Sequence, residues 1–84
     1  METLVKTADG KYVWVDTRFL GDCWETGVFA CNKEGKIESW DDLNVKRYPD
    51  YPAAAEGHAQ MAAQWRLKSR TECQEYRLRR YGVH

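Results

Sequence analysis

The sequence predicts a single α+β domain over residues 1–84, in which an antiparallel β-meander of about three to five strands packs on one long C-terminal helix. Residues 1–48 are rich in β-branched and aromatic side chains and are interrupted by glycine turns. Residues 51–80 instead form a helical segment with a basic tail, and they carry alanines and other apolar side chains at helical spacing. Because the chain has only 84 residues, there is room for one hydrophobic core.

The first three strands are predicted from alternation and turn chemistry. Asp9-Gly10 supplies the positive-φ position of a tight turn, so residues 3–7 and 11–17 are expected to pair as a hairpin. The Gly21-Asp22 turn follows. Residues 24–31 then place alternate side chains on two faces, which predicts a third strand.

A second hairpin and a short last strand complete the predicted sheet. The turn at residues 32–35 ends on Gly35, where a bulged type I turn favours glycine, and it leads into an expected strand over residues 36–40. A last short strand is expected around residues 43–48.

Helix signals begin directly after the last expected strand. Asp50 is a good N-cap, and Pro52 is tolerated in the first turn. The apolar stripe that would lie on the sheet consists of Ala54, Ala55, His58, Met61, Ala62 and Trp65. After it the helix either continues as a protruding basic rod or breaks near residue 70, where Thr71 is the candidate cap of a second helix.

Charge and cysteine usage restrict the class of function. The net charge is zero, but residues 1–65 carry 7 Lys/Arg against 11 Asp/Glu, whereas residues 66–84 carry 6 against 2. This balance does not suggest a dedicated nucleic-acid binder, although the basic tail keeps a phosphate contact open. The three cysteines have no close-spaced partner, as is usual in a reducing compartment. No apolar run approaches the roughly 20 residues of a membrane span, so we expect a cytoplasmic protein.

Two groups of residues are singled out. Gly57, His58 and Trp65 are expected to be structural, because the glycine lets helix and sheet approach closely and a packed histidine usually finds a hydrogen-bond partner on a strand. Aromatic and arginine side chains are enriched at protein interfaces. The candidate contacts with a partner are therefore Trp40, Arg77, Arg79, Arg80 and Tyr81.

Catalysis and metal binding have weaker support. The cysteines and histidines form no CxxC, HxxxH or HExxH unit, so neither a metal nor a cofactor is expected. Two alternatives to a protein-binding factor stay open: a small nucleic-acid-binding module that uses the basic C-terminal helix, and a small enzyme or enzyme subunit built around His58 and a cysteine.

Several segments together resemble a known family. They are Val15-Asp16-Thr17, Phe19-Leu20-Gly21, Trp24-Glu25-Thr26, Val28-Phe29, Arg47-Tyr48 and Ala54-Ala55-Glu56-Gly57-His58. The pattern is similar to a family of short bacteriophage and prophage proteins with V-S-T-x-F-L-G, F-E-T-x-V-F, R-Y and E-A-x-x-G-H segments. The likeness covers about residues 13–62. This chain departs from it with Asp16 in place of the usual Ser and with a shorter loop at Asp22-Cys23.

The resemblance implies a phage origin but no active site, and no catalytic residue follows from it. Small phage proteins of this size are often accessory factors that block a host machine. The resemblance therefore favours an inhibitor of a host protein complex in the bacterial cytosol, such as an anti-CRISPR or another anti-defence protein directed at a CRISPR–Cas or restriction effector.

Overall fold

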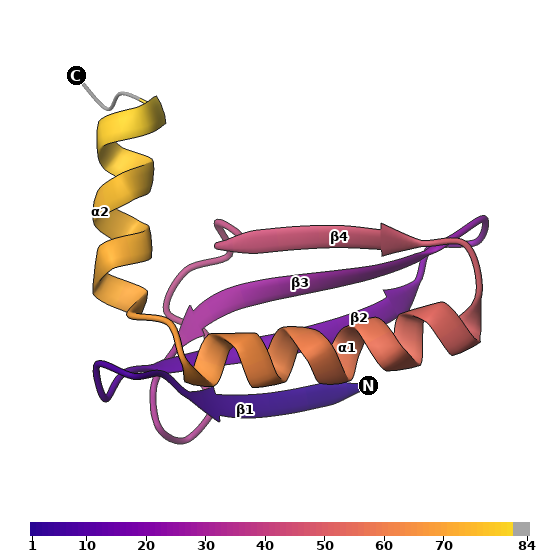
Figure 1. The fold of residues 1–84 in the computed structure, drawn as a ribbon, viewed down its shortest axis with the longest axis horizontal. Coiled ribbons are helices and arrows are strands. Elements are labelled where there is room, and N and C mark those ends of the chain that lie inside the picture. The colour runs from indigo at the N-terminus through magenta and orange to yellow at the C-terminus, as the bar shows by residue number, and fades with distance from the viewer. Residues whose placement is uncertain (82–84) are drawn as a thin grey trace.

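The computed structural model describes residues 1–81, with side chains up to residue 78, and shows an α+β fold. One antiparallel sheet has the strand order β1-β2-β3-β4, and Figure 1 shows α1 running along one of its faces. The strands are β1 (Glu2–Lys6), β2 (Tyr12–Phe19), β3 (Trp24–Cys31) and β4 (Asn44–Tyr48), and the helices are α1 (Tyr51–Arg66) and α2 (Arg70–Tyr81). The predicted fold class and the meander are thus confirmed.

The turn between β1 and β2 forms as its sequence predicts. Gly10 has a φ of +78°, which L side chains rarely adopt. The Thr7 amide donates to the Lys11 carbonyl at 2.9 Å and closes the turn. Leu4 then lies opposite Trp14 in the register.

The strand expected over residues 36–40 is wrong. Only one isolated bridge forms there, between Ile37 and Cys31. The Glu38 amide still donates to the Ala30 carbonyl beside this bridge, but no ladder continues from it, and β4 pairs with the other part of the same edge, from Trp24–Tyr48 to Val28–Asn44. The turn itself does form, because the Asn32 side chain accepts hydrogen bonds from the amides of Glu34 and Lys36.

Helix α1 begins at its predicted cap and buries one side. The Asp50 carboxylate accepts the Ala53 amide at 2.9 Å. The buried residues of α1 are Ala54, Gly57, His58, Met61, Ala62 and Trp65. The last three of these residues form one core cluster with Val5, Val13, Val15 and Val28 of the sheet. Trp65, at 1% exposed, closes the end of this core.

Gly57 sits where α1 crosses β4. A Cβ atom placed on Gly57 would lie 2.1 Å from Cζ of Tyr48 and 2.2 Å from its hydroxyl oxygen. Carbon atoms in contact stay about 3.5–4.0 Å apart, so no side chain fits here unless the ring or the helix moves. The absence of a side chain is what lets the helix lie on the tyrosine ring.

The expectation of a single long C-terminal helix is wrong, and the alternative of a break near residue 70 is confirmed. Leu67 caps the end of α1, and its amide donates to the Gln64 carbonyl. The cap of α2 is Ser69 rather than Thr71, because the Ser69 hydroxyl accepts the Glu72 amide at 3.1 Å. Within residues 1–81, neither helix has the length and apolarity that a bilayer crossing requires.

Candidate functional site

The face of the sheet opposite α1 carries an apolar row across three strands. In the register, Leu4 of β1 lies beside Trp14 of β2, which lies beside Phe29 of β3. Trp40, from the segment between β3 and β4, packs edge-on against Phe29 with ring centroids 5.2 Å apart. We call Leu4, Trp14, Phe29 and Trp40 the aromatic row.

Trp40 is the most exposed member of this row. Its side chain is 69% exposed although it contacts Phe29, and Leu4 is 38% exposed. Holding a large aromatic ring in water has no benefit for folding, because burying such a ring is among the larger hydrophobic gains available to a small protein. An exposed tryptophan that packs against a second aromatic ring is a typical interface anchor.

A shallow depression of about 300 Å³ lies beside Trp40. Gly27 forms part of it, and the Phe29 ring leans over this glycine, since a Cβ there would lie 2.9 Å from the ring. The residues around the depression are Asp16, Arg18, Leu20, Glu25, Gly27, Phe29 and Trp40. It therefore has an aromatic wall and a charged rim, which is the pattern of an interface core with its polar border.

The rim charges are already paired within the chain. Arg18 forms an ion pair with Asp16, and Arg47 contacts Glu25 at 3.0 Å. The neighbouring carboxylates raise the pKa of both guanidinium groups. These pairs hold the charged groups in place around the aromatic row while leaving the depression itself without net charge.

His58 lies on the other face, in a buried hydrogen-bond network between α1 and the sheet. Its Nδ1 is 2.6 Å from Oγ1 of Thr17, and its Nε2 is 2.8 Å from Oγ1 of Thr3. Thr17 in turn contacts Oγ1 of Thr26 at 2.6 Å. Burial lowers the pKa of His58, and the N-terminal ammonium lowers it further against a small opposite effect of Asp16. Both ring nitrogens therefore have partners in the core, and the imidazole is neutral at pH 7.

Cys31, the buried cysteine, is not placed to work with His58. Cys31 lies five residues along β3 from Thr26, a distance of about 17 Å at the usual strand rise. Burial raises the pKa of the Cys31 thiol, which favours the unreactive protonated form. Among residues 1–81 no group of His, Cys, Asp and Glu side chains has the geometry to hold a metal ion.

The predicted contact residues fall on two different surfaces. Trp40 lines the depression on the open sheet face, whereas Arg77 lies on α2 and forms an ion pair with Asp42 at 3.9 Å. The side chains of Arg79, Arg80 and Tyr81 lie outside the described part of the chain. The segment between β3 and β4 separates the surfaces, since Ser39 and Asp41 line a hollow against α2 while Trp40 lines the other.

Sequence reasoning considered Trp14, Trp24 and Trp40 as candidate anchors on the exposed side of the sheet, but it missed Leu4 and Phe29 as companions of Trp40. The alternation within β3 puts Phe29 on the face away from Thr26 and Val28, which is a usable signal. The missing information was the register, because only the pairing of Leu4, Trp14 and Phe29 turns three separate side chains into one row. No family model, no curated protein and no solved structure matches this chain.

Proposed function

We infer that this protein is a non-enzymatic binding module that docks a partner protein onto the open face of its sheet, with Trp40 as the anchor. The observation that carries the proposal is the aromatic row itself. It combines a 69% exposed tryptophan, a depression of about 300 Å³ beside it and a rim of paired charges. Hot spots in protein interfaces have this composition: an aromatic anchor surrounded by a polar border that excludes water.

The resemblance to phage proteins supports a more specific partner. We propose a protein complex of the bacterial host, bound stoichiometrically and blocked, with CRISPR–Cas and restriction effectors as the first candidates. Several residues of the segments that carry the resemblance lie on or under the open face: Leu20 and Phe29 border the depression, and Thr17 anchors His58 beneath it. An inhibitor of this size works by covering a surface, and this requires a rigid face rather than a catalytic centre.

The state of the arginines disfavours the nucleic-acid alternative. Four of the five arginines with described side chains, Arg18, Arg47, Arg70 and Arg77, form ion pairs with carboxylates of the same chain. Binding to phosphates needs cations that can exchange their counterions for the backbone charge. These four would first have to give up a carboxylate partner, so their contribution to phosphate binding is reduced.

The test compares Trp40→Ala with Leu67→Ala as baits. Leu67 is 84% exposed and lies at the link between α1 and α2, so it matches Trp40 in exposure but not in position. Each immobilised protein is exposed to nuclease-treated bacterial lysate, and the bound proteins are quantified by mass spectrometry. We expect a partner that wild type and Leu67→Ala retain and that Trp40→Ala binds at least ~10-fold more weakly. Equal retention by Trp40→Ala would contradict the proposed docking face.

The inhibitor part of the proposal has its own test. Purified CRISPR–Cas and restriction effectors are titrated with wild type and with Trp40→Ala, and DNA cleavage is measured. Inhibition that saturates at one molecule per effector, and that is lost in Trp40→Ala, is expected for one of these effectors. If a partner is captured but its activity is unchanged, the proposal of a binding module stands and the proposal of an inhibitor is contradicted.

A further inference from the structure

The outer edge of β1 is a row of backbone groups that the described chain leaves unpaired. Within residues 1–81, β1 is the first strand of the sheet and pairs with β2 alone. The Thr17 amide donates to the Met1 carbonyl at 2.8 Å. Because bonded pairs alternate along an antiparallel ladder, Thr3 and Val5 bond to β2 as Met1 does. The residues whose amides and carbonyls point away from the sheet are therefore Glu2, Leu4 and Lys6.

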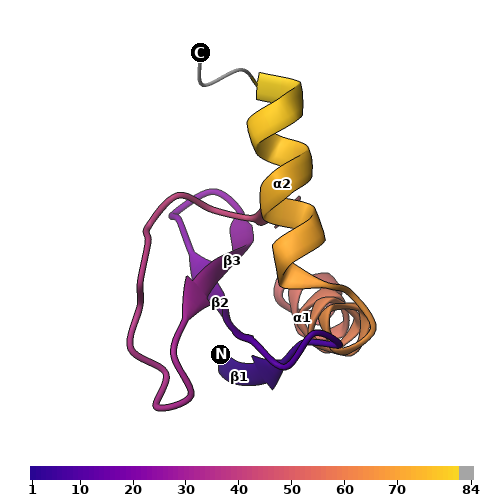
Figure 2. The ribbon, with the colours of Figure 1, turned by 90° about the vertical axis from the view of Figure 1, so that its left-hand side faces the viewer.

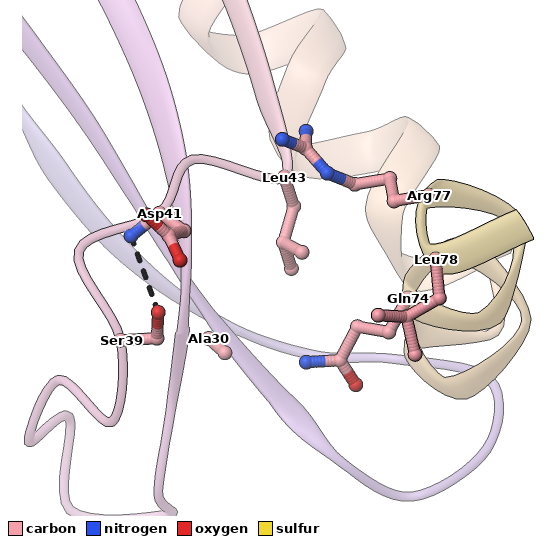
Figure 3. A pocket seen from close by; sticks show the side chains of 7 residues that line it. All are labelled: Ala30, Ser39, Asp41, Leu43, Gln74, Arg77 and Leu78. Carbon is pink, nitrogen blue, oxygen red and sulfur yellow. Dashed lines mark hydrogen bonds between the residues drawn. The ribbon is translucent and has the colours of Figure 1, made fainter. Parts of the chain in front are cut away.

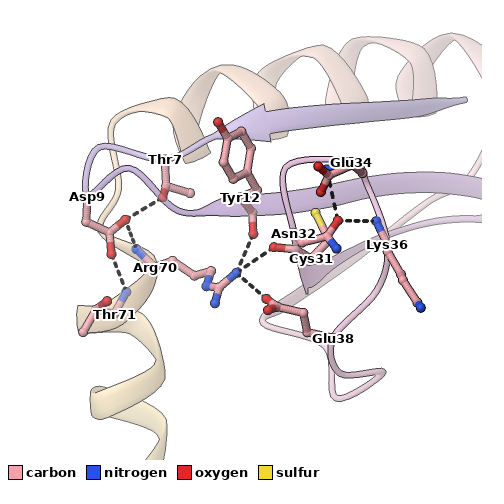
Figure 4. Close-up of polar contacts among 10 residues, drawn as sticks. All are labelled: Thr7, Asp9, Tyr12, Cys31, Asn32, Glu34, Lys36, Glu38, Arg70 and Thr71. Atoms are coloured by element: carbon pink, nitrogen blue, oxygen red, sulfur yellow. Dashed lines mark hydrogen bonds and ion pairs between the residues drawn. The ribbon is translucent and has the colours of Figure 1, made fainter.

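Helix α2 leaves this edge open. Its first turn is held beside the turn that follows β1, since the Asp9 carboxylate accepts the amides of Arg70 and Thr71 at 3.0 and 2.9 Å (Figure 4). From there α2 extends away from β1, past the other strands, as Figures 1 and 2 show. A strand added to β1 would therefore not meet α2 of the same copy.

The opposite edge of the sheet, along β4, is less suited to a second strand. Helix α2 stands beside the start of β4, where Arg77 forms an ion pair with Asp42 and Leu43 faces the helix across a hollow of about 350 Å³ (Figure 3). The strand itself carries Lys46 and Arg47 and no acidic residue. Pairing of two β4 strands would bring like charges together, and lysine on an exposed edge is a common protection against strand addition.

The sequence of β1, in contrast, is complementary to itself. Glu2 and Lys6 lie at equal distances on either side of Leu4. A two-fold axis at Leu4 therefore places Glu2 of one copy opposite Lys6 of the other, at both ends of the pair. Both side chains are exposed, and within the described side chains no ion pair involves either of them. Opposite charges at directly paired positions stabilise antiparallel strands.

The backbone and the apolar side chains fit the same register. The axis pairs the three residues whose amides and carbonyls point outwards, so each pair can exchange two N–H···O=C bonds. Leu4 is 38% exposed on the open face. In a bonded pair the two Cα atoms are about 5.5 Å apart, so Leu4 of each copy would pack on Leu4 of the other. The pairing removes apolar surface from water at the centre of the contact.

Helix α1, on the other face of the sheet, leaves room for the second copy. Gly57 lies against β4, whereas His58 contacts Thr3 of β1, so the flank of α1 beyond His58 overlies the outer side of β1. With about 100° between successive residues, this flank begins with Ala62 and Ala55. Helices pack about 8–10 Å apart, depending on the side chains between them, and alanines permit the shorter distance.

We propose that this protein forms a two-fold symmetric homodimer in which β1 pairs antiparallel with β1 of a second copy and joins the two sheets into one. The same contacts occur twice, as an isologous interface requires. The open faces of both copies then lie on the same side of the joined sheet. The contact leaves Trp40 and its depression free, so the dimer and the proposed docking face stand or fall separately.

Sedimentation velocity and light scattering between ~5 and ~500 µM test the dimer, because a contact of this small size is at the weak end of specific interfaces. Glu2→Lys and Lys6→Glu each place like charges opposite one another at both ends of the pair. Lys33→Glu, in an exposed turn, is the matched charge control. We expect wild type and Lys33→Glu to dimerise equally and each β1 variant ~10-fold more weakly, with unchanged circular dichroism. A wild type that is monomeric at the highest concentration, or β1 variants that dimerise as wild type does, would overturn the proposal.

Charge exchange tests the register. An equimolar mixture of Glu2→Lys and Lys6→Glu should form a heterodimer, because both ends of the pair regain opposite charges. The double variant Glu2→Lys with Lys6→Glu should dimerise as wild type does, for the same reason. Amide exchange followed by NMR identifies the strand: the amides of Leu4 and Lys6 should become more protected as the protein concentration rises. No recovery in the mixture or in the double variant, or added protection on β4 in place of β1, would contradict the pairing.

Discussion

Replacement of Gly57 by alanine tests the contact that sets the distance between α1 and the sheet. The added Cβ would lie 2.1 Å from Cζ of Tyr48. Overpacking of this kind costs about 1–3 kcal/mol, while alanine gains about 1 kcal/mol over glycine in a helix. Since the atom it meets belongs to a rigid ring, we expect a net loss of about 1–2 kcal/mol in the free energy of unfolding.

Urea and thermal unfolding, followed by circular dichroism and tryptophan fluorescence, measure this loss. For a domain of this size each kcal/mol corresponds to a shift of about 4–8 °C in Tm. Ala59→Gly on the exposed side of α1 calibrates helix propensity alone and should lose about 1 kcal/mol.

A double-mutant cycle with Tyr48 decides the cause. In the Tyr48→Ala background the ring is absent, so Gly57→Ala should become stabilising, by up to about 1 kcal/mol relative to Tyr48→Ala alone. Stabilisation by Gly57→Ala in the wild-type background would refute the close approach of α1 to Tyr48. The same loss in both backgrounds would refute the assignment of the clash to the tyrosine ring.

Two further predictions concern the polar contacts. The pKa of His58 in the folded protein lies below its ordinary value of 6.5, so the unfolded chain binds a proton that the folded chain does not. His58 therefore contributes stability above pH 6.5, and this stability is lost as the pH falls from 6.5 towards the pKa of the folded state. The urea midpoint of wild type should fall over this pH window, and the midpoint of His58→Gln should fall less. Asp9→Ala removes the side chain that accepts the first amides of α2, and it should cost about 1 kcal/mol, seen as faster hydrogen exchange confined to α2. Asp22→Ala, in another exposed turn, should leave α2 exchange unchanged, and a uniform effect of Asp9→Ala on all amides would contradict a local role.

Local signals in the sequence predicted much of the sheet and the start of α1. Period-two alternation identified β3, and Asp50 marked the first turn of α1 because its cap is a contact between neighbours in the chain. The strand expected over residues 36–40 is reduced to one bridge between Ile37 and Cys31, and Trp40 packs instead on the ring of Phe29, a contact that local alternation does not predict.

The break between the helices and the open face depend on longer-range contacts. Ser69 is a local cap, but the acceptor that holds the first amides of α2 is Asp9, which lies 61 residues earlier than Arg70. In the same way Trp40 was predicted as a candidate partner contact, whereas its packing against Phe29 follows from the path of the chain over the sheet. Turns and helix starts could be predicted from neighbouring residues. Contacts that depend on the strand register, or on where the chain passes over the sheet, could not be predicted in this way.

The proposed docking face is tested most directly by photo-crosslinking from Val45, which lies on the open face opposite Gly27 and is 45% exposed. A benzophenone amino acid at position 45 leaves Trp40 intact, and the same group at position 67 is the matched control. In bacterial lysate, position 45 should yield one dominant protein adduct that disappears when Trp40→Ala is added, and position 67 should yield none. Adducts from position 67 but not from position 45, or an adduct at position 45 that Trp40→Ala leaves unchanged, would contradict binding through the aromatic row.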